Sequence, residues 1–166
     1  MALQLYKIAA VEVSSAGSST IAFSNIPQGY TDLKLVLSAR SNNANIYDYC
    51  YINFNSNGYN ASVRFLQGSG AGASSNNEAT GYIGIIDGNT ATVSTFSSNE
   101  IYIPNYAGGT NKSFSVDGTM ETNGTTSYMH LVAGLWSNTA AINSITIKPD
   151  VNSFLQYTTA TLYGIL

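Results

Sequence analysis

Charged side chains are scarce in this sequence. It has 6 basic and 9 acidic residues among 166, or 9% of the chain, with a net charge of −3 at pH 7; a typical soluble domain carries about 25%. Hydrophobic residues still make up 44%, which excludes charge-rich disorder because a core can form. No apolar run approaches the ~20 residues of a membrane-spanning helix. The sequence contains no cluster of Lys or Arg residues that could neutralise nucleic-acid phosphates. We therefore expect neither membrane insertion nor nucleic-acid binding.

Cysteine and histidine each occur once. The single Cys50 cannot form an internal disulfide, so cysteine usage does not indicate an oxidising compartment. The first residues show no basic stretch followed by an apolar one, so no secretory signal is predicted. We expect the protein to be made in a cytoplasm.

In place of charge the chain carries 21 Ser, 16 Thr and 18 Asn, together with many segments of alternating polarity. Thr31 to Ala39 places Leu33, Leu35 and Leu37 on one face, and Lys112 to Glu121 alternates in the same way. Such period-two alternation is typical of half-buried antiparallel strands. Weaker versions occur at 3–13, 20–26, 49–55, 62–67, 81–86, 91–103, 128–136, 143–148 and 154–165.

These segments predict a single all-β domain over residues 1–166, an antiparallel β-sandwich of about 8–11 strands. The strand number favours a jelly-roll-like topology over an immunoglobulin-like one. The dipeptide Asp87-Gly88 is typical of tight turns and lies between two candidate strands, so it predicts a hairpin. The small polar residues of 68–80 predict a flexible surface loop.

Candidate catalytic groups are few and isolated. His130 is in phase with Trp136 in an apolar run, which favours a hydrogen-bonded structural histidine over a catalytic base. Cys50 alternates with Phe54, which favours a buried thiol over a nucleophile. The nine carboxylates are scattered, although a glycosidase-like pair across a sheet stays open. We predict no enzyme, no catalytic residues, no cofactor and no metal site.

Tyrosine is abundant, with 12 residues. Tyr47, Tyr49 and Tyr51 alternate with the apolar set of the same strand and would line up on its outer face; we add Tyr59 as a fourth candidate contact. Tyrosine combines apolar area with a hydroxyl group, which suits protein interfaces and sugar stacking alike. The four are therefore candidate subunit or glycan contacts, and the alternative is a second core face or ordinary cross-strand pairs.

Several segments of the chain resemble a recurring domain of tailed-phage virion proteins, found among marine and cyanobacterial phages and described as virion structural or tail-fibre-like. The likeness covers nearly the whole chain and supplies no catalytic residues. The matching segments are IPQGYTDLKL (26–35), YINFN (51–55), EIYIPNY (100–106), KSFSVD (112–117), LVAGLWSNTAAI (131–142) and QYTTATLYGI (156–165).

The resemblance implies a component of the virion, assembled in the cytoplasm of a bacterial host. Because the chain has no coiled-coil heptads, collagen-like repeat or long shaft, we expect a non-enzymatic capsid decoration, or cement, protein. It would act as a homo-oligomer, expected to be a trimer, on the major capsid protein or another virion protein. The alternative is a tail-fibre or receptor-binding module whose tyrosines recognise host surface glycans. A glycan-degrading enzyme is the third alternative.

Overall fold

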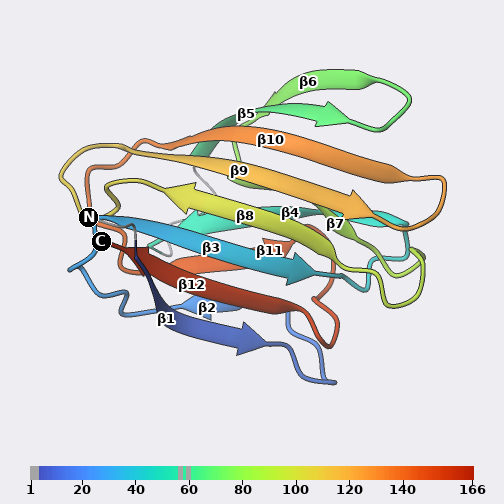
Figure 1. Cartoon of the computed structure of the whole chain (residues 1–166), viewed down its shortest axis with the longest axis horizontal. Helices are drawn as coiled ribbons and strands as arrows, with labels where there is room; N and C mark the ends of the chain where they lie inside the picture. Colours follow the sequence, from blue (N-terminus) through green and yellow to red (C-terminus); the bar gives the residue numbers. More distant parts are fainter. Residues whose placement is uncertain (1–3, 56–57, 59–60) are drawn as a thin grey trace.

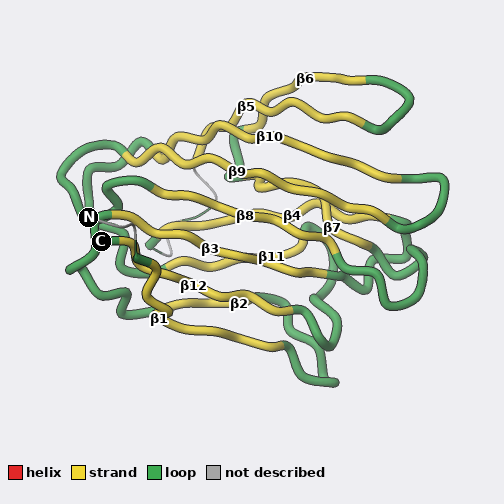
Figure 2. Tube along the Cα trace, in the orientation of Figure 1, coloured by secondary structure: helices red, strands yellow, loops and turns green. Residues whose placement is uncertain are grey.

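Every regular element of the described chain is a β-strand. The computed structural model describes residues 4–55, 58 and 61–166, and these form strands, turns and loops without a helix (Figure 2). Among the described residues there is thus no helix long and apolar enough to span a membrane. The strands are β1 (Leu5–Glu12), β2 (Ile21–Phe23), β3 (Asp32–Ala39), β4 (Tyr47–Phe54), β5 (Ala61–Gly68), β6 (Ala73–Glu78), β7 (Tyr82–Asp87), β8 (Ser97–Ile103), β9 (Lys112–Glu121), β10 (Ser127–Trp136), β11 (Ile145–Pro149) and β12 (Thr159–Ile165) (Figure 1).

The strands form two antiparallel sheets. The large sheet has eight strands in the order β1-β12-β3-β8-β9-β10-β5-β6, and the small sheet has four in the order β2-β11-β4-β7. β1 and β12, the first and last described strands, pair with each other, with Leu5 opposite Ile165, and lie side by side (Figure 1). The prediction of an antiparallel β-sandwich is confirmed.

Eight of the strands follow the jelly-roll order. β1-β12-β3-β8 lie next to one another in the large sheet and face β2-β11-β4-β7, so the chain passes repeatedly from one sheet to the other. This is the two-Greek-key arrangement expected of a jelly roll. The remaining strands, β9, β10, β5 and β6, widen the large sheet on one side.

Side chains that alternate along the strands fill the space between the sheets. Leu33, Leu35 and Leu37 of β3 are fully buried, as predicted from their spacing. In β9, whose alternation predicts one buried face, Phe114, Val116 and Met120 are buried and their neighbours are exposed. Aromatic rings connect the two layers: Phe54 of β4 packs against Phe114 and Trp136 of the large sheet, with centroids 5.6 Å apart in each case.

The segment 68–80, which we predicted to be a loop, contains a strand. β6 pairs with β5 in a continuous antiparallel ladder from Gly68 and Ala73 to Val63 and Glu78. Its residues ASSNNE are almost entirely exposed, so neither face needs apolar side chains and no hydrophobic period marks the strand. Backbone pairing to β5 alone defines it, which raises the number of strands to twelve among the described residues.

The hairpin predicted at Asp87-Gly88 does not form. After β7 the chain leaves the small sheet and crosses to β8 in the large sheet. The buried guanidinium of Arg40 holds this crossing, because it donates to the backbone carbonyls of Asn89, Ala91, Thr92 and Thr95 at 2.7–3.2 Å. A segment that wraps around a cation cannot also extend into a ladder.

His130 is buried and lies within hydrogen-bond distance of a neighbouring side chain, as predicted. Its Nε2 lies 3.0 Å from Oδ1 of Asn99. A Cβ at Gly118 of β9 would lie 2.1 Å from this nitrogen and one at Gly84 of β7 would lie 1.7 Å from it, so the imidazole occupies space between the two sheets that glycine leaves open. Burial lowers the pKa of His130 to about 4. Cys50 is also buried, and burial raises the pKa of its thiol, which disfavours the reactive thiolate.

Candidate functional site

The predicted row of tyrosines lies on the outer face of β4. Tyr47 and Tyr51 are half-buried and Tyr49 is 40% exposed. Cys50 and Ile52, which lie on either side of Tyr51 in the sequence, are buried in the core. The fourth candidate, Tyr59, lies outside the described residues. The row is therefore placed as its alternation predicted, and its role as a contact stays a prediction.

A cleft of about 260 Å³ lies where this row meets the β5–β6 hairpin. The hairpin stands at the edge of the large sheet (Figure 1), and the side chains on one of its faces turn towards β4 and β7. Aromatic rings and uncharged or acidic polar side chains line the cleft in comparable numbers. The lining residues are Tyr49, Tyr51, Phe65, Gln67, Ser74, Ser75, Asn76, Glu78 and Tyr82.

Tyr82 is the centre of the aromatic part of the cleft. Its ring lies 4.8 Å from that of Phe65 and contacts Tyr49 and Tyr51 edge-on at 5.9 and 6.2 Å. The backbone of β7 explains why Tyr82 contacts all three rings. The ladder between β4 and β7 shifts register between Cys50 and Tyr51, and Tyr82 is the residue that pairs with Tyr51. An irregularity of this kind redirects side chains at a sheet edge.

The hydroxyl of Tyr82 is buried and has no hydrogen-bond partner among the described residues. The whole residue is only 2% exposed. A buried hydroxyl without a partner costs about 1–3 kcal/mol, so this group has unused hydrogen-bonding capacity.

The phenols of the cleft stay protonated at neutral pH. Burial raises the pKa of Tyr82, and that of Tyr51 to about 12, with a smaller contribution to Tyr51 from the carboxylates of Asp150 and Glu78. Burial also raises the pKa of Tyr49. Each hydroxyl can therefore both donate and accept a hydrogen bond, and the lining contains one carboxylate, Glu78, and no basic residue.

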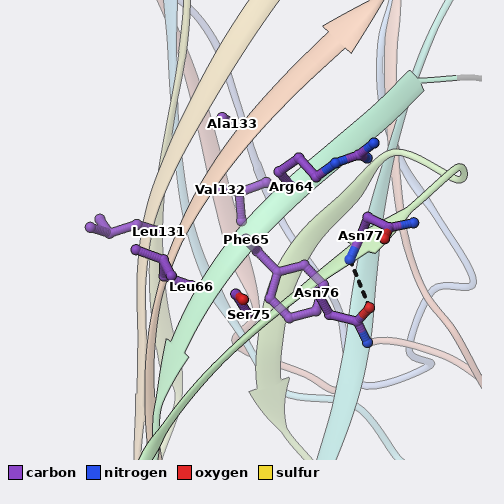
Figure 3. Close-up of a pocket in the computed structure, with 9 residues that line it drawn as sticks. All are labelled: Arg64, Phe65, Leu66, Ser75, Asn76, Asn77, Leu131, Val132 and Ala133. Carbon is purple, nitrogen blue, oxygen red and sulfur yellow. Dashed lines mark hydrogen bonds between the residues drawn. The ribbon is translucent and has the colours of Figure 1, made fainter.

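A second surface feature lies on the outer face of the large sheet. Leu131 of β10 pairs directly with Leu66 of β5, and their side chains lie on the same side of the two strands (Figure 3). Met129 and Leu135 continue the same face of β10. We call these four side chains the apolar strip. Their exposed fractions are 57% for Leu131, 59% for Leu66, 64% for Met129 and 40% for Leu135. A groove of about 530 Å³ runs beside the strip and is lined further by Arg64, Ser75 and Asn77.

Sequence reasoning missed most of the cleft. Phe65 and Tyr82 belong to strands that were predicted correctly, but nothing in their local pattern indicates that they meet across two sheets. Gln67 and Glu78 are contributed by the hairpin whose second strand was not predicted. The apolar strip had a visible signal: Met129, Leu131 and Leu135 alternate in opposite phase to the buried set of β10, so both faces of that strand are apolar.

Neither surface offers a metal site. Within the described ranges, no three His, Cys, Asp or Glu side chains gather closely enough to hold an ion. The chemistry available in the cleft is hydrogen bonding and aromatic stacking, and that of the strip is apolar contact.

No protein-family model matches the chain, and no curated protein is significantly similar to it. Among solved structures, a fructofuranosidase from Schwanniomyces occidentalis in complex with fructosylnystose matches with a TM-score of 0.27 and 8% identity, over 98% of this chain and 33% of that one. The chain thus spans about a third of that enzyme's length. The CBM2 module of the evolved Dit protein of Lactobacillus casei BL23 phage J-1 matches with a TM-score of 0.18 and 9% identity, over 88% and 68%. Scores this low carry no argument about fold or function.

Proposed function

We propose that the chain is a non-enzymatic structural protein on the surface of a tailed-phage virion, most specifically a capsid decoration protein that acts as a homo-oligomer. The apolar strip is the observation that carries this proposal. Contiguous exposed apolar side chains on a rigid sheet are typical of protein interfaces. The resemblance of the sequence to virion proteins supports the choice of a viral particle as the larger assembly.

The strip has the composition of an interface centre. Leucine and methionine occupy the middle, and the uncharged Ser75 and Asn77 lie beside them with Arg64 as the one charge of the groove. Apolar centres with polar rims are characteristic of specific contacts. Because the four side chains of the strip are uncharged, a second copy that presents the same strip is the simplest complementary surface.

Low charge also determines how such contacts respond to salt. Contacts between uncharged surfaces depend little on ionic strength, whereas ion pairs are screened within about 10 Å at 0.1 M salt. Each oligomer would bind several neighbouring capsid subunits at once, so individually weak contacts add over the lattice. Binding to the assembled shell then stabilises it by mass action.

Particles that lack the protein test this proposal. We expect them to release their genome at a lower temperature than complete particles, and purified protein added back should restore the difference. A Leu66→Asp variant should fail to restore it, because a monomer loses the lattice avidity, while Val93→Asp, on an isolated exposed valine, should succeed. Equal disruption temperatures with and without the protein would overturn the proposal.

A further inference from the structure

We propose that the cleft between β4, β7 and the β5–β6 hairpin binds a neutral saccharide, with Tyr49 as the stacking platform and the Tyr82 hydroxyl as a buried hydrogen-bond partner. This site goes beyond the structural role proposed above and does not depend on it.

The shape and lining of the cleft fit one or two sugar rings. A pyranose has a face of C–H groups and a rim of hydroxyls, and an aromatic ring presents a negative face that attracts such C–H groups. Tyr49 supplies an aromatic ring that is 40% exposed and is held edge-on against Tyr82 at 5.9 Å. The volume of about 260 Å³ lies just below the ~300–1,000 Å³ of sites for drug-sized ligands.

The polar half of the lining suits sugar hydroxyls. Gln67, Ser74 and Asn76 stand on the hairpin opposite the tyrosines, and amide and hydroxyl groups can both donate to and accept from a sugar. Part of Asn76 is already used, because its Oδ1 accepts from the backbone N–H of Asn77 at 2.8 Å. The groups that remain are few and specific, as in other small-molecule sites.

Tyr82 gives an independent indication of a ligand. The residue lines the cleft, and its hydroxyl is buried and lacks a partner in the described chain. Buried polar groups are normally satisfied, so an unsatisfied one at the wall of a cleft is accounted for when a ligand supplies the missing bond.

The charge of the cleft selects among saccharides. Glu78 is the one charged group in the lining and no Lys, Arg or His lies there, and the carboxylate of Asp150 lies near enough to act on the pKa of Tyr51. Uronic acids, sialic acids and phosphorylated sugars would meet this negative charge without a compensating cation. Neutral sugars meet no such repulsion.

Saturation-transfer NMR with defined sugars tests the site. The probes are methyl glycosides of glucose, galactose, mannose and N-acetylglucosamine with lactose and cellobiose, and the acidic counterparts are glucuronic and N-acetylneuraminic acid. We expect at least one neutral probe to receive saturation at its C–H face, with an affinity on the order of millimolar, and the acidic probes to receive none.

Three variants locate the binding. Tyr49→Ala should weaken it by about tenfold because the stacking platform is lost, and Tyr82→Phe should weaken it by about tenfold because one hydrogen bond to the sugar is lost. Tyr102→Ala removes a tyrosine of equal exposure, 38%, from the outer face of β8 and should leave binding unchanged. Because Tyr82→Phe keeps the ring, the fold survives and a loss of binding reports on the hydroxyl.

Two results would overturn the proposal. One is the absence of saturation transfer to every neutral probe; the other is unchanged binding in Tyr49→Ala. If no sugar binds and Tyr49→Ala prevents incorporation of the protein into particles, the cleft is a protein contact and the saccharide proposal is wrong. Failure of the sugar experiment leaves the particle-disruption experiment unaffected, so the two proposals can fail separately.

Discussion

The ring of Phe65 in the large sheet packs against the ring of Tyr82 in the small sheet, with centroids 4.8 Å apart. This contact joins the β5–β6 hairpin to the edge of the small sheet and fixes the aromatic wall of the cleft. The cleft is therefore built on paired strands, which hold side chains more rigidly than loops do.

Replacing Tyr82 by phenylalanine should stabilise the unliganded protein. The change removes a buried hydroxyl without a partner and keeps the ring contacts, so we expect the free energy of unfolding to rise by about 1 kcal/mol. Tyr82→Ala, by contrast, should lower it by roughly 3–5 kcal/mol because the ring contacts are lost. Urea unfolding measures both changes. A Tyr82→Phe variant less stable than the parent would contradict the account of the hydroxyl.

Substituting Gly118 should disturb His130. A Cβ there would lie 2.1 Å from Nε2 of His130 and 2.3 Å from Oδ1 of Asn99, and both groups are buried and cannot move aside. We expect Gly118→Ala to lower the free energy of unfolding by about 1–3 kcal/mol. Gly109→Ala is the matched control, because nothing lies within 4 Å of its added Cβ. Equal stability of the two variants would show that the imidazole is not confined.

His130 should make stability depend on mildly acidic pH. Burial lowers its pKa from 6.5 to about 4, so between these values the unfolded chain binds a proton that the folded chain does not. The free energy of unfolding therefore falls as the pH drops from ~6.5 to ~4, by about 3 kcal/mol in all, and is constant above this window. A His130→Gln variant should lack this decrease.

The two buried carboxyls act in the opposite direction. Burial raises the pKa of Asp48 and Asp87 above 3.8, so their contribution to stability is lost as the pH rises. Both carboxyls are present in parent and variant, and the difference between the two pH profiles isolates His130. An NMR titration of the imidazole with a midpoint near 6.5 would contradict the prediction.

Arg40 should control the crossing between β7 and β8. Arg40→Met removes the donors to four carbonyls of residues 89–95 and leaves the aspartate at 87 without its neighbouring cation. We expect a loss of roughly 3–5 kcal/mol, as for other broken buried charge contacts, and faster amide exchange over residues 88–96. If exchange in that segment matches the parent, Arg40 does not hold the crossing.

The apolar strip should govern self-association. Leu66→Asp changes an exposed side chain whose ladder partners, Leu131 and Ser75, are uncharged, so folding stability should move by no more than about 1 kcal/mol, while sedimentation should show a shift from oligomer to monomer. Val93→Asp, on a side chain that is 84% exposed, controls for added charge. A parent protein that is monomeric at all concentrations would rule out the strip as a contact between copies.

The sequence predicts those strands in which buried and exposed side chains alternate. It does not predict strands or turns that lack this alternation. Alternation located β3 and β9 correctly because one face of each contacts the core. β6 was missed because the residues of ASSNNE face solvent on both sides, and the crossing after Asp87 was misread because its conformation is set by Arg40, 47 residues earlier in the chain.

The candidate site follows the same division. The row of Tyr47, Tyr49 and Tyr51 depends on the alternation within one strand and was predicted. The cleft depends on strand order and on a register shift in β7, which bring Phe65 and Tyr82 together from different sheets. A single sequence does not specify either of these.

Localisation on intact particles tests the proposed function most directly. Cryo-electron microscopy of the virion, with antibody fragments raised against the purified protein as markers, should place regularly spaced copies on the head shell. Markers confined to the tail, or absent from purified particles, would contradict the decoration role.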